Sequence, residues 1–187
     1  MTSTDKQAER QPVISVTVQH ATEDDREKMG IALRQLLHED PTFDVSSEPN
    51  TGQTVIRGMG ELHLEIILDR LNREFNIRPS TVGRPQIVYH NASREVGHET
   101  ETVLLEPLMA LEVFLFGDDL ASLVTADLSS RRGRIDAVEH RGSNRVIKAV
   151  VPLAEMLGYA AHLRRETDGR ASYSMQFARY DEVSPGK

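Results

Sequence analysis

The sequence has 187 residues, of which 39% are hydrophobic and 27% charged, a composition that fits one large or two small globular domains. It contains no cysteine, which excludes disulfides, thiolate metal sites and thiol nucleophiles. Its formal net charge of −7 gives no general attraction to nucleic acid, so any RNA contact needs a local basic patch. No apolar run approaches the roughly 20 residues that span a bilayer. We therefore expect no membrane partner and a cytoplasmic location.

The first half of the chain predicts the element order β-α-β-β-α-β. Residues 1–11 are polar and aperiodic, as expected of a disordered tail. A helix is predicted to begin at Thr22, because a threonine cap followed by acidic residues suits a helix start, and Pro41 closes that segment. A second helix is predicted from Gly60. The expected strands cover residues 13–18, 43–47, 54–57 and 86–89.

The second half predicts the same order after a polar segment, residues 93–101, which we interpret as a linker. One helix is predicted to end at Gly133, and another follows Pro152, a residue suited to a first helical turn. The expected strands cover residues 108–116, 134–139, 146–151 and 171–180. Two β-α-β-β-α-β units predict an α+β fold of two ferredoxin-like α/β sandwiches with antiparallel sheets.

Long strings of residues resemble bacterial translation elongation factor G. RGMGELHLEIILDRLNREF at residues 57–75 is similar to the second-helix signature of domain III of that family. VLLEP at 103–107, SRRGRI at 130–135, VIKAVVPLAEMLGYAAHLR at 146–164 and GRASYSMQFARYDEV at 169–183 are similar to its domain V. The resemblance implies a domain III-like unit at 12–92, a domain V-like C-terminal unit at 102–183 and a short tail at 184–187.

The family is a five-domain GTPase that drives tRNA–mRNA translocation, and the resemblance covers two of its domains. The G domain, domain II and domain IV have no counterpart in this sequence. Neither the phosphate-binding pattern GxxxxGK[ST] nor the pattern DxxG occurs. We therefore expect no enzyme activity, no cofactor and no binding of free nucleotide.

The strongest basic cluster in the sequence is a candidate contact for ribosomal RNA. It comprises Arg131, Arg132, Arg134, Arg141, Arg145 and Lys148. Alternatively, Arg131 and Arg132 fall in the last turn of the predicted helix and complement its dipole. Pairing of the others with Asp136 and Glu139 is a further alternative. Arg164, Arg165 and Arg170 form a second, weaker basic group.

Gly58, Gly60 and His63 lie at a predicted strand-to-helix junction and are candidates for an interface. Free N–H groups at such a helix start could bind a phosphate, or the glycines could simply permit a tight turn. Glu61 and Glu65 flank His63, but residues two apart on a helix point in different directions. We therefore predict no metal site there.

Phe114 and Phe116 are candidates for an apolar interface. Alternation along residues 108–116 places them opposite Leu111, Val113 and Leu115, which are predicted to face the helices. The exposed face needs a cover, from the other unit or from a second copy in a possible homodimer. An RNA-recognition motif, which shares this fold, is disfavoured because the predicted strands 54–57 and 146–151 lack the aromatic residues that stack bases.

No Ser-His-Asp or paired-carboxylate pattern predicts catalysis, and no nucleophile-elbow pattern GxSxG occurs. The leading hypothesis is a truncated elongation factor G-like, non-catalytic protein whose partner is the ribosome, both RNA and proteins. One alternative is a ferredoxin-like regulatory or oligomerisation module that acts away from the ribosome. Another is that the sequence is a fragment of a longer factor.

Overall fold

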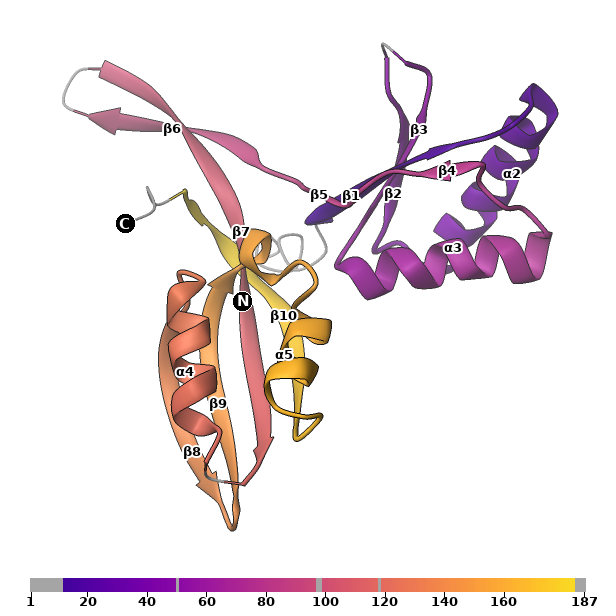
Figure 1. The fold of residues 1–187 in the computed structure, drawn as a ribbon. Helices are drawn as coiled ribbons and strands as arrows, with labels where there is room; N and C mark the ends of the chain where they lie inside the picture. The colour runs from indigo at the N-terminus through magenta and orange to yellow at the C-terminus, as the bar shows by residue number, and fades with distance from the viewer. Residues whose placement is uncertain (1–11, 50, 97–98, 118, 184–187) are drawn as a thin grey trace. The chain divides into compact units, whose positions relative to one another are not determined.

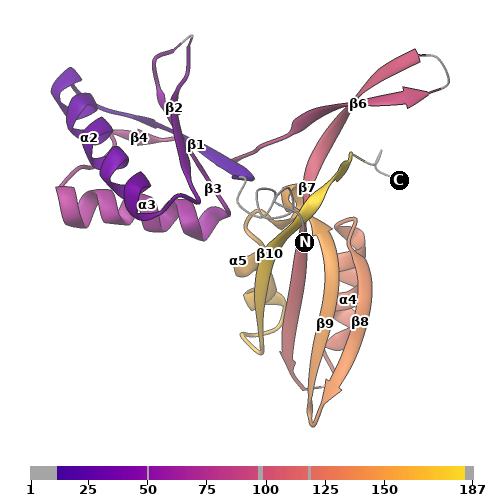
Figure 2. The same cartoon turned by 180° about the vertical axis from the view of Figure 1, so that it is seen from behind.

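The computed structural model describes residues 12–49, 51–96, 99–117 and 119–183 (Figures 1 and 2). The chain divides into two compact units, Met1–Val88 and Tyr89–Lys187, and each is treated by itself. The tails expected at residues 1–11 and 184–187 lie outside the described residues. Within the described ranges, no helix is long and apolar enough to cross a membrane.

The first unit is a five-stranded antiparallel sheet with two helices. Its sheet order is β2-β3-β1-β4, and β5 also pairs with β1, so the predicted β-α-β-β-α arrangement is confirmed. Of the final predicted strand, 86–89, residues 86–87 form β5, and an additional short strand at residues 81–82 precedes it; both border β1. They are separated around Pro85, which has no N–H to continue a ladder. The elements are β1 (Ile14–Gln19), α2 (Glu23–Glu39), β2 (Asp44–Ser47), β3 (Thr54–Gly58), α3 (Glu61–Phe75), β4 (Thr81–Val82) and β5 (Gln86–Ile87).

The helices of this unit form where the sequence signals predict them. The Thr22 hydroxyl accepts a hydrogen bond from the Asp25 N–H at 3.1 Å, which caps the start of α2. Helix α2 buries one stripe of side chains and ends at Glu39, so that Asp40 caps it and Pro41 follows. Helix α3 begins after Gly60 and buries a matching stripe. The buried residues are Met29, Ala32, Leu33, Leu36, Leu64, Ile67 and Leu71.

The second unit repeats the β-α-β-β-α-β order and adds one strand. Its sheet order is β10-β7-β9-β8, the ferredoxin-like arrangement, with β6 also paired to β7. The helix predicted after Pro152 is a 3-10 turn followed by a separate helix, because Gly158 adopts a left-handed conformation between them. The elements are β6 (His90–Val96), β7 (Glu99–Phe116), α4 (Ala121–Ser130), β8 (Arg134–Arg141), β9 (Asn144–Pro152), η1 (Leu153–Met156), α5 (Tyr159–Glu166) and β10 (Ala171–Glu182).

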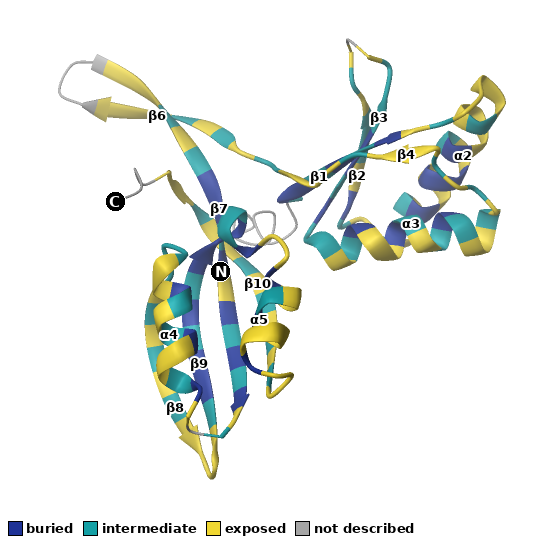
Figure 3. Cartoon of the chain, viewed as in Figure 1, coloured by how far each residue is buried: buried dark blue, intermediate teal, exposed yellow. Residues whose placement is uncertain are grey.

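Within the segment interpreted as a linker, residues 93–96 and 99–101 belong to two paired strands. Strand β6 pairs with the first part of β7 in continuous antiparallel register, from His90↔Leu105 to Val96↔Glu99. The division between the units falls at residues 88/89 instead. The described side chains of β6 lie largely outside the core (Figure 3). The strand is therefore held by backbone pairing and needs no alternation of hydrophobic residues, so the sequence gives no signal for it.

Strand β7 carries the alternation that the sequence predicts. Leu111, Val113 and Leu115 are fully buried beneath α4 and α5, whereas Phe116 is 55% exposed on the other face. Phe114 is half-buried on that face and lies opposite Val146 of β9. The covering of this face by the other unit or by a second copy stays a prediction.

Candidate functional site

The six cations of the predicted basic cluster separate into two groups in the structure. Arg131 and Arg132 directly follow α4, and Arg134 begins β8. Arg141 lies at the far end of β8, about 23 Å away at the usual strand rise of roughly 3.3 Å per residue. On the neighbouring strand, Arg145 lies near that far end, opposite His140, and Lys148 lies opposite Ala137 in the middle of β8. The fold therefore does not gather the six cations into one patch.

Arg132 is held by a buried carboxylate. Its two terminal nitrogens donate to both oxygens of Glu106 at 2.7 and 2.9 Å, and its Nε donates to Glu155 at 3.0 Å. The Glu106 side chain is only 3% exposed. Arg132 also has a left-handed backbone, φ 59°, at the position after a helix where glycine is usual. The bidentate pair offsets that strain and gives Arg132 a structural role.

Arg131 is also engaged within its own unit. The sequence predicts both arginines inside the last helical turn, but α4 ends at Ser130 and Arg131 is its C-terminal cap. The Arg131 guanidinium donates to Asp127 at 3.1 Å and to the Glu155 carbonyl at 2.6 Å, and it lies 5.0 Å from the centre of the Tyr159 ring. Contact of this guanidinium with an RNA phosphate would compete with those interactions.

Lys148 and Arg141 of the second group lie on the sheet face opposite the helices, and Glu139 engages both, whereas Arg145 lies opposite Leu115 on the other face. Lys148 is 2.6 Å from Glu139 and 3.8 Å from Glu112, and Arg141 is 3.1 Å from Glu139. The hydrogen bonds from Lys148 and Arg141 lower the pKa of the Glu139 carboxyl. Arg145 lies 2.9 Å from the His140 ring, and Arg134, in the first group, pairs with Asp136. The predicted pairing with Asp136 and Glu139 is therefore confirmed.

The strand-to-helix junction of the first unit is organised by His63. Its Nδ1 accepts a hydrogen bond from the Met59 N–H at 3.1 Å, and its Nε2 lies 3.1 Å from an Asp40 oxygen. Gly58 packs closely against the start of α3, because a Cβ there would lie 3.0 Å from the Leu64 side chain and 3.1 Å from the His63 ring. Gly60, in contrast, has open space around it. His63 thus clamps the turn at the start of α3.

The contribution of Asp40 to this clamp depends on pH. Desolvation opposes the charged form, but hydrogen bonds from Thr42 and His63 outweigh it and lower the pKa of the Asp40 carboxyl below its ordinary value. A carboxyl whose pKa is lowered on folding stabilises the folded state fully when the pH is above its ordinary, unfolded-state pKa. This stabilisation is lost as the pH falls through the lowered pKa of the folded state. Asp40 was not predicted as a partner of His63, because 23 residues separate them in the sequence.

Replacing His63 with alanine is expected to free the Met59 N–H and to destabilise the junction by about 1 kcal/mol, the usual net value of a hydrogen bond. Hydrogen exchange of the Met59 amide should accelerate accordingly. Glu65→Ala on the same helix, which removes an exposed carboxylate, is the matched control and should leave this exchange unchanged. An unaltered Met59 exchange rate in His63→Ala would contradict the clamp.

The weaker basic group, on and after α5, includes a cation without a partner among the described residues. Arg170 pairs with Asp119 at 3.0 Å, and Arg165 pairs with Glu166 at 3.0 Å. The Arg164 side chain has no hydrogen bond or ion pair to any residue that the structure describes, although its carbonyl accepts from the Gly169 N–H at 2.9 Å. It lines two shallow hollows of the surface, beside the small residues Ala160 and Gly169. Within the described ranges, no group of three or more His, Asp or Glu could hold a metal ion.

The fold defines the class of this protein: two successive ferredoxin-like α+β domains with antiparallel sheets. A family model described as Elongation Factor G, domain III matches residues 10–82, and one described as Elongation factor G C-terminus matches residues 103–187. The chain therefore belongs to the elongation factor G family and is similar to translation elongation factors. The paired parts of β6 and β7 occupy most of the interval between the two matched ranges.

A solved structure supports the same fold. The crystal structure of a protein from Thermus thermophilus is 21% identical to this chain and superimposes on it with a TM-score of 0.54. The match covers 94% of this chain but 41% of the Thermus chain. The sequence thus spans less than half of the length of the protein it matches.

Proposed function

We propose that this chain binds the ribosome in the cytoplasm as a non-catalytic part of the translation machinery. The observation that carries the proposal is the succession of two elongation factor G domains along most of the chain. The overall charge of −7 does not favour RNA, so an RNA contact has to be local.

Helix α5 supplies the best local candidate for that contact. Arg164 is unpaired within the described part of the chain, whereas the arginines after α4 are engaged by acidic side chains. A small neighbour such as Ala160 or Gly169 lets a phosphate backbone approach the guanidinium closely. Arg165, the next residue, is exposed but paired with Glu166 at 3.0 Å, so Arg164 is the main candidate. We therefore place the RNA contact on α5 rather than on the cluster around Arg131.

Co-sedimentation with purified ribosomes at low and moderate salt tests this surface. The charge reversal Arg164→Glu is expected to weaken binding about tenfold and to reduce the salt slope by roughly one, since one phosphate contact is lost. Arg134→Glu is the control, because Arg134 is exposed but already paired with Asp136. No binding of the unaltered chain at either salt would instead favour a module that acts away from the ribosome.

The non-catalytic part of the proposal predicts no GTP binding by the 187-residue chain. The phosphate groups of GTP need a P-loop, and no GxxxxGK[ST] pattern is present to form one. Isothermal titration of GTP with magnesium into the chain should give no heat of binding. Micromolar affinity in that titration would overturn this part of the proposal.

A further inference from the structure

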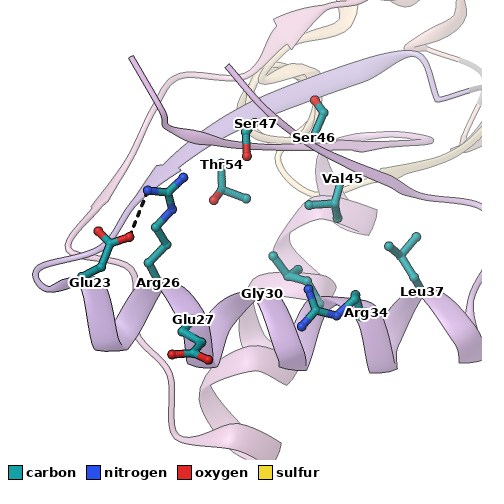
Figure 4. Close-up of a pocket in the computed structure, with 11 residues that line it drawn as sticks. Glu23, Arg26, Glu27, Gly30, Arg34, Leu37, Val45, Ser46, Ser47 and Thr54 are labelled. Carbon is teal, nitrogen blue, oxygen red and sulfur yellow. Dashed lines mark hydrogen bonds and ion pairs between the residues drawn. The ribbon is translucent and has the colours of Figure 1, made fainter. Parts of the chain in front are cut away.

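A groove runs along one border of the first unit, between α2 and the edge strand β2 (Figure 4). Its volume is ≈ 600 Å³. The apolar side chains Leu33, Leu37 and Val45 lie along it, and charged residues of α2 form its rim. Gly30 keeps the middle of the groove open, because the nearest atom to a Cβ placed there is the Arg34 guanidinium at 3.8 Å.

The backbone of β2 offers unused hydrogen-bonding groups to this groove. Strand β2 is the terminal strand of the sheet and pairs only with β3 among the described strands. The Glu48 N–H donates to the Gln53 carbonyl at 2.8 Å, which fixes the phase of the antiparallel ladder. In such a ladder, every second residue of β2 hydrogen-bonds to β3 through its backbone. Val45 and Ser47 are the residues between, so their N–H and C=O groups point to the free edge. Both residues line the groove.

The charges along the groove indicate the chemistry of its occupant. Arg26, near one end, is paired with Glu23 at 3.1 Å. The Arg34 side chain is exposed and makes no hydrogen bond or ion pair with the residues that the structure describes. Glu27 also lines the groove, so an acidic side chain is complementary only at the position beside Arg34. A peptide that adds to a sheet edge places alternate side chains toward the flanking helix. Apolar side chains at those positions fit against Leu37 and Val45, and an acidic side chain complements Arg34.

We propose that this groove binds an extended, acidic peptide segment of a partner protein, which adds to β2 as a further strand and pairs a carboxylate with Arg34. The hydrogen bonds to Val45 and Ser47 supply affinity that is independent of sequence, and the apolar and acidic side chains supply selectivity. Residues 1–11 of this chain are a poorer occupant, since Met1 and Ala8 are their only apolar side chains.

The test uses the full-length chain labelled with nitrogen-15 and an array of acetylated nonapeptides that alternate valine and threonine. In one set a single glutamate moves along the peptide, and in the matched set a lysine replaces it. A glutamate peptide should shift the amide signals of Val45 and Ser47 and protect them from exchange, and bind about tenfold more tightly than its lysine counterpart at low salt. Arg34→Glu should reverse this preference.

Two substitutions at Gly30 separate blocking of the groove from damage to the fold. Gly30→Gln fills the groove and should abolish binding, although glutamine is a better helix former than glycine by roughly 0.5–1 kcal/mol, so folding is retained. Gly30→Ala adds one methyl group and should still bind the peptide. A thermal melt of each variant verifies that it is folded.

Four outcomes would overturn the proposal. The first is failure of every peptide in the array to bind at millimolar concentration, and the second is equal binding to Gly30→Gln and to the unaltered chain. Protection of Val45 and Ser47 that rises with protein concentration in the absence of peptide would assign the edge to a second copy of the chain. Loss of protection on removal of residues 1–11 would assign it to the N-terminal segment.

Discussion

Replacing Glu106 with alanine is expected to destabilise the second unit by about 3 kcal/mol, because it removes the buried partner of the Arg132 guanidinium. Arg132 would lose this bidentate pair while its backbone stays in a left-handed conformation that costs free energy. For a unit of this size, 1 kcal/mol corresponds to roughly 4–8 °C, so its melting temperature should fall by more than about 10 °C. Calorimetric melting of the full chain measures the change.

Two variants make this prediction specific. Arg134→Ala breaks an exposed pair with Asp136 and should cost no more than about 1 kcal/mol, the usual limit for surface ion pairs. The double replacement Glu106→Leu with Arg132→Met removes both charges together and should recover most of the loss. A melting temperature of Glu106→Ala equal to that of the unaltered chain would show that the pair does not stabilise the fold.

Replacing Leu71 with alanine is expected to destabilise the first unit by about 3 kcal/mol and to leave the second unit unchanged. Leu71 is fully buried on α3, and truncation of such a side chain removes apolar contacts and leaves a cavity. The two units are separate compact bodies, so the loss should be confined to one of them. Hydrogen exchange measured by mass spectrometry on peptides from each unit during urea unfolding distinguishes the two.

Leu62 provides the matched control for this second prediction. It lies on the same helix but is 68% exposed, so Leu62→Ala should change the stability by less than about 0.5 kcal/mol. The prediction fails if the two leucine variants are equally destabilised, or if Leu71→Ala accelerates exchange in both units to the same extent.

Much of the fold could be predicted from the sequence because its signals are local. Capping by Thr22, helical periodicity in α2 and α3, and alternation at Leu111, Val113 and Leu115 each depend on residues a few positions apart. These signals determined the type and order of the main helices and strands, and hence the two ferredoxin-like units. The family also followed from continuous strings of residues, and both family models confirm it.

The candidate site was less predictable, because the partner of a charge is set by contacts between distant residues. The sequence shows a run of arginines, but Glu106, which pairs with Arg132, lies 26 residues away. The same holds for Asp40 and His63. These contacts divide the predicted cluster into two groups of paired cations and leave Arg164 as a better candidate for an external partner.

The sequence by itself therefore determined the elements, the fold class and the family, which depend on local periodicity and on contiguous motifs. Only the tertiary structure decided that residues 90–96 pair with residues 99–105, which cations are paired, and that β2 borders an open groove beside α2. Strand pairing, ion pairing and free edges arise between segments far apart in the chain, and no short-range pattern encodes them.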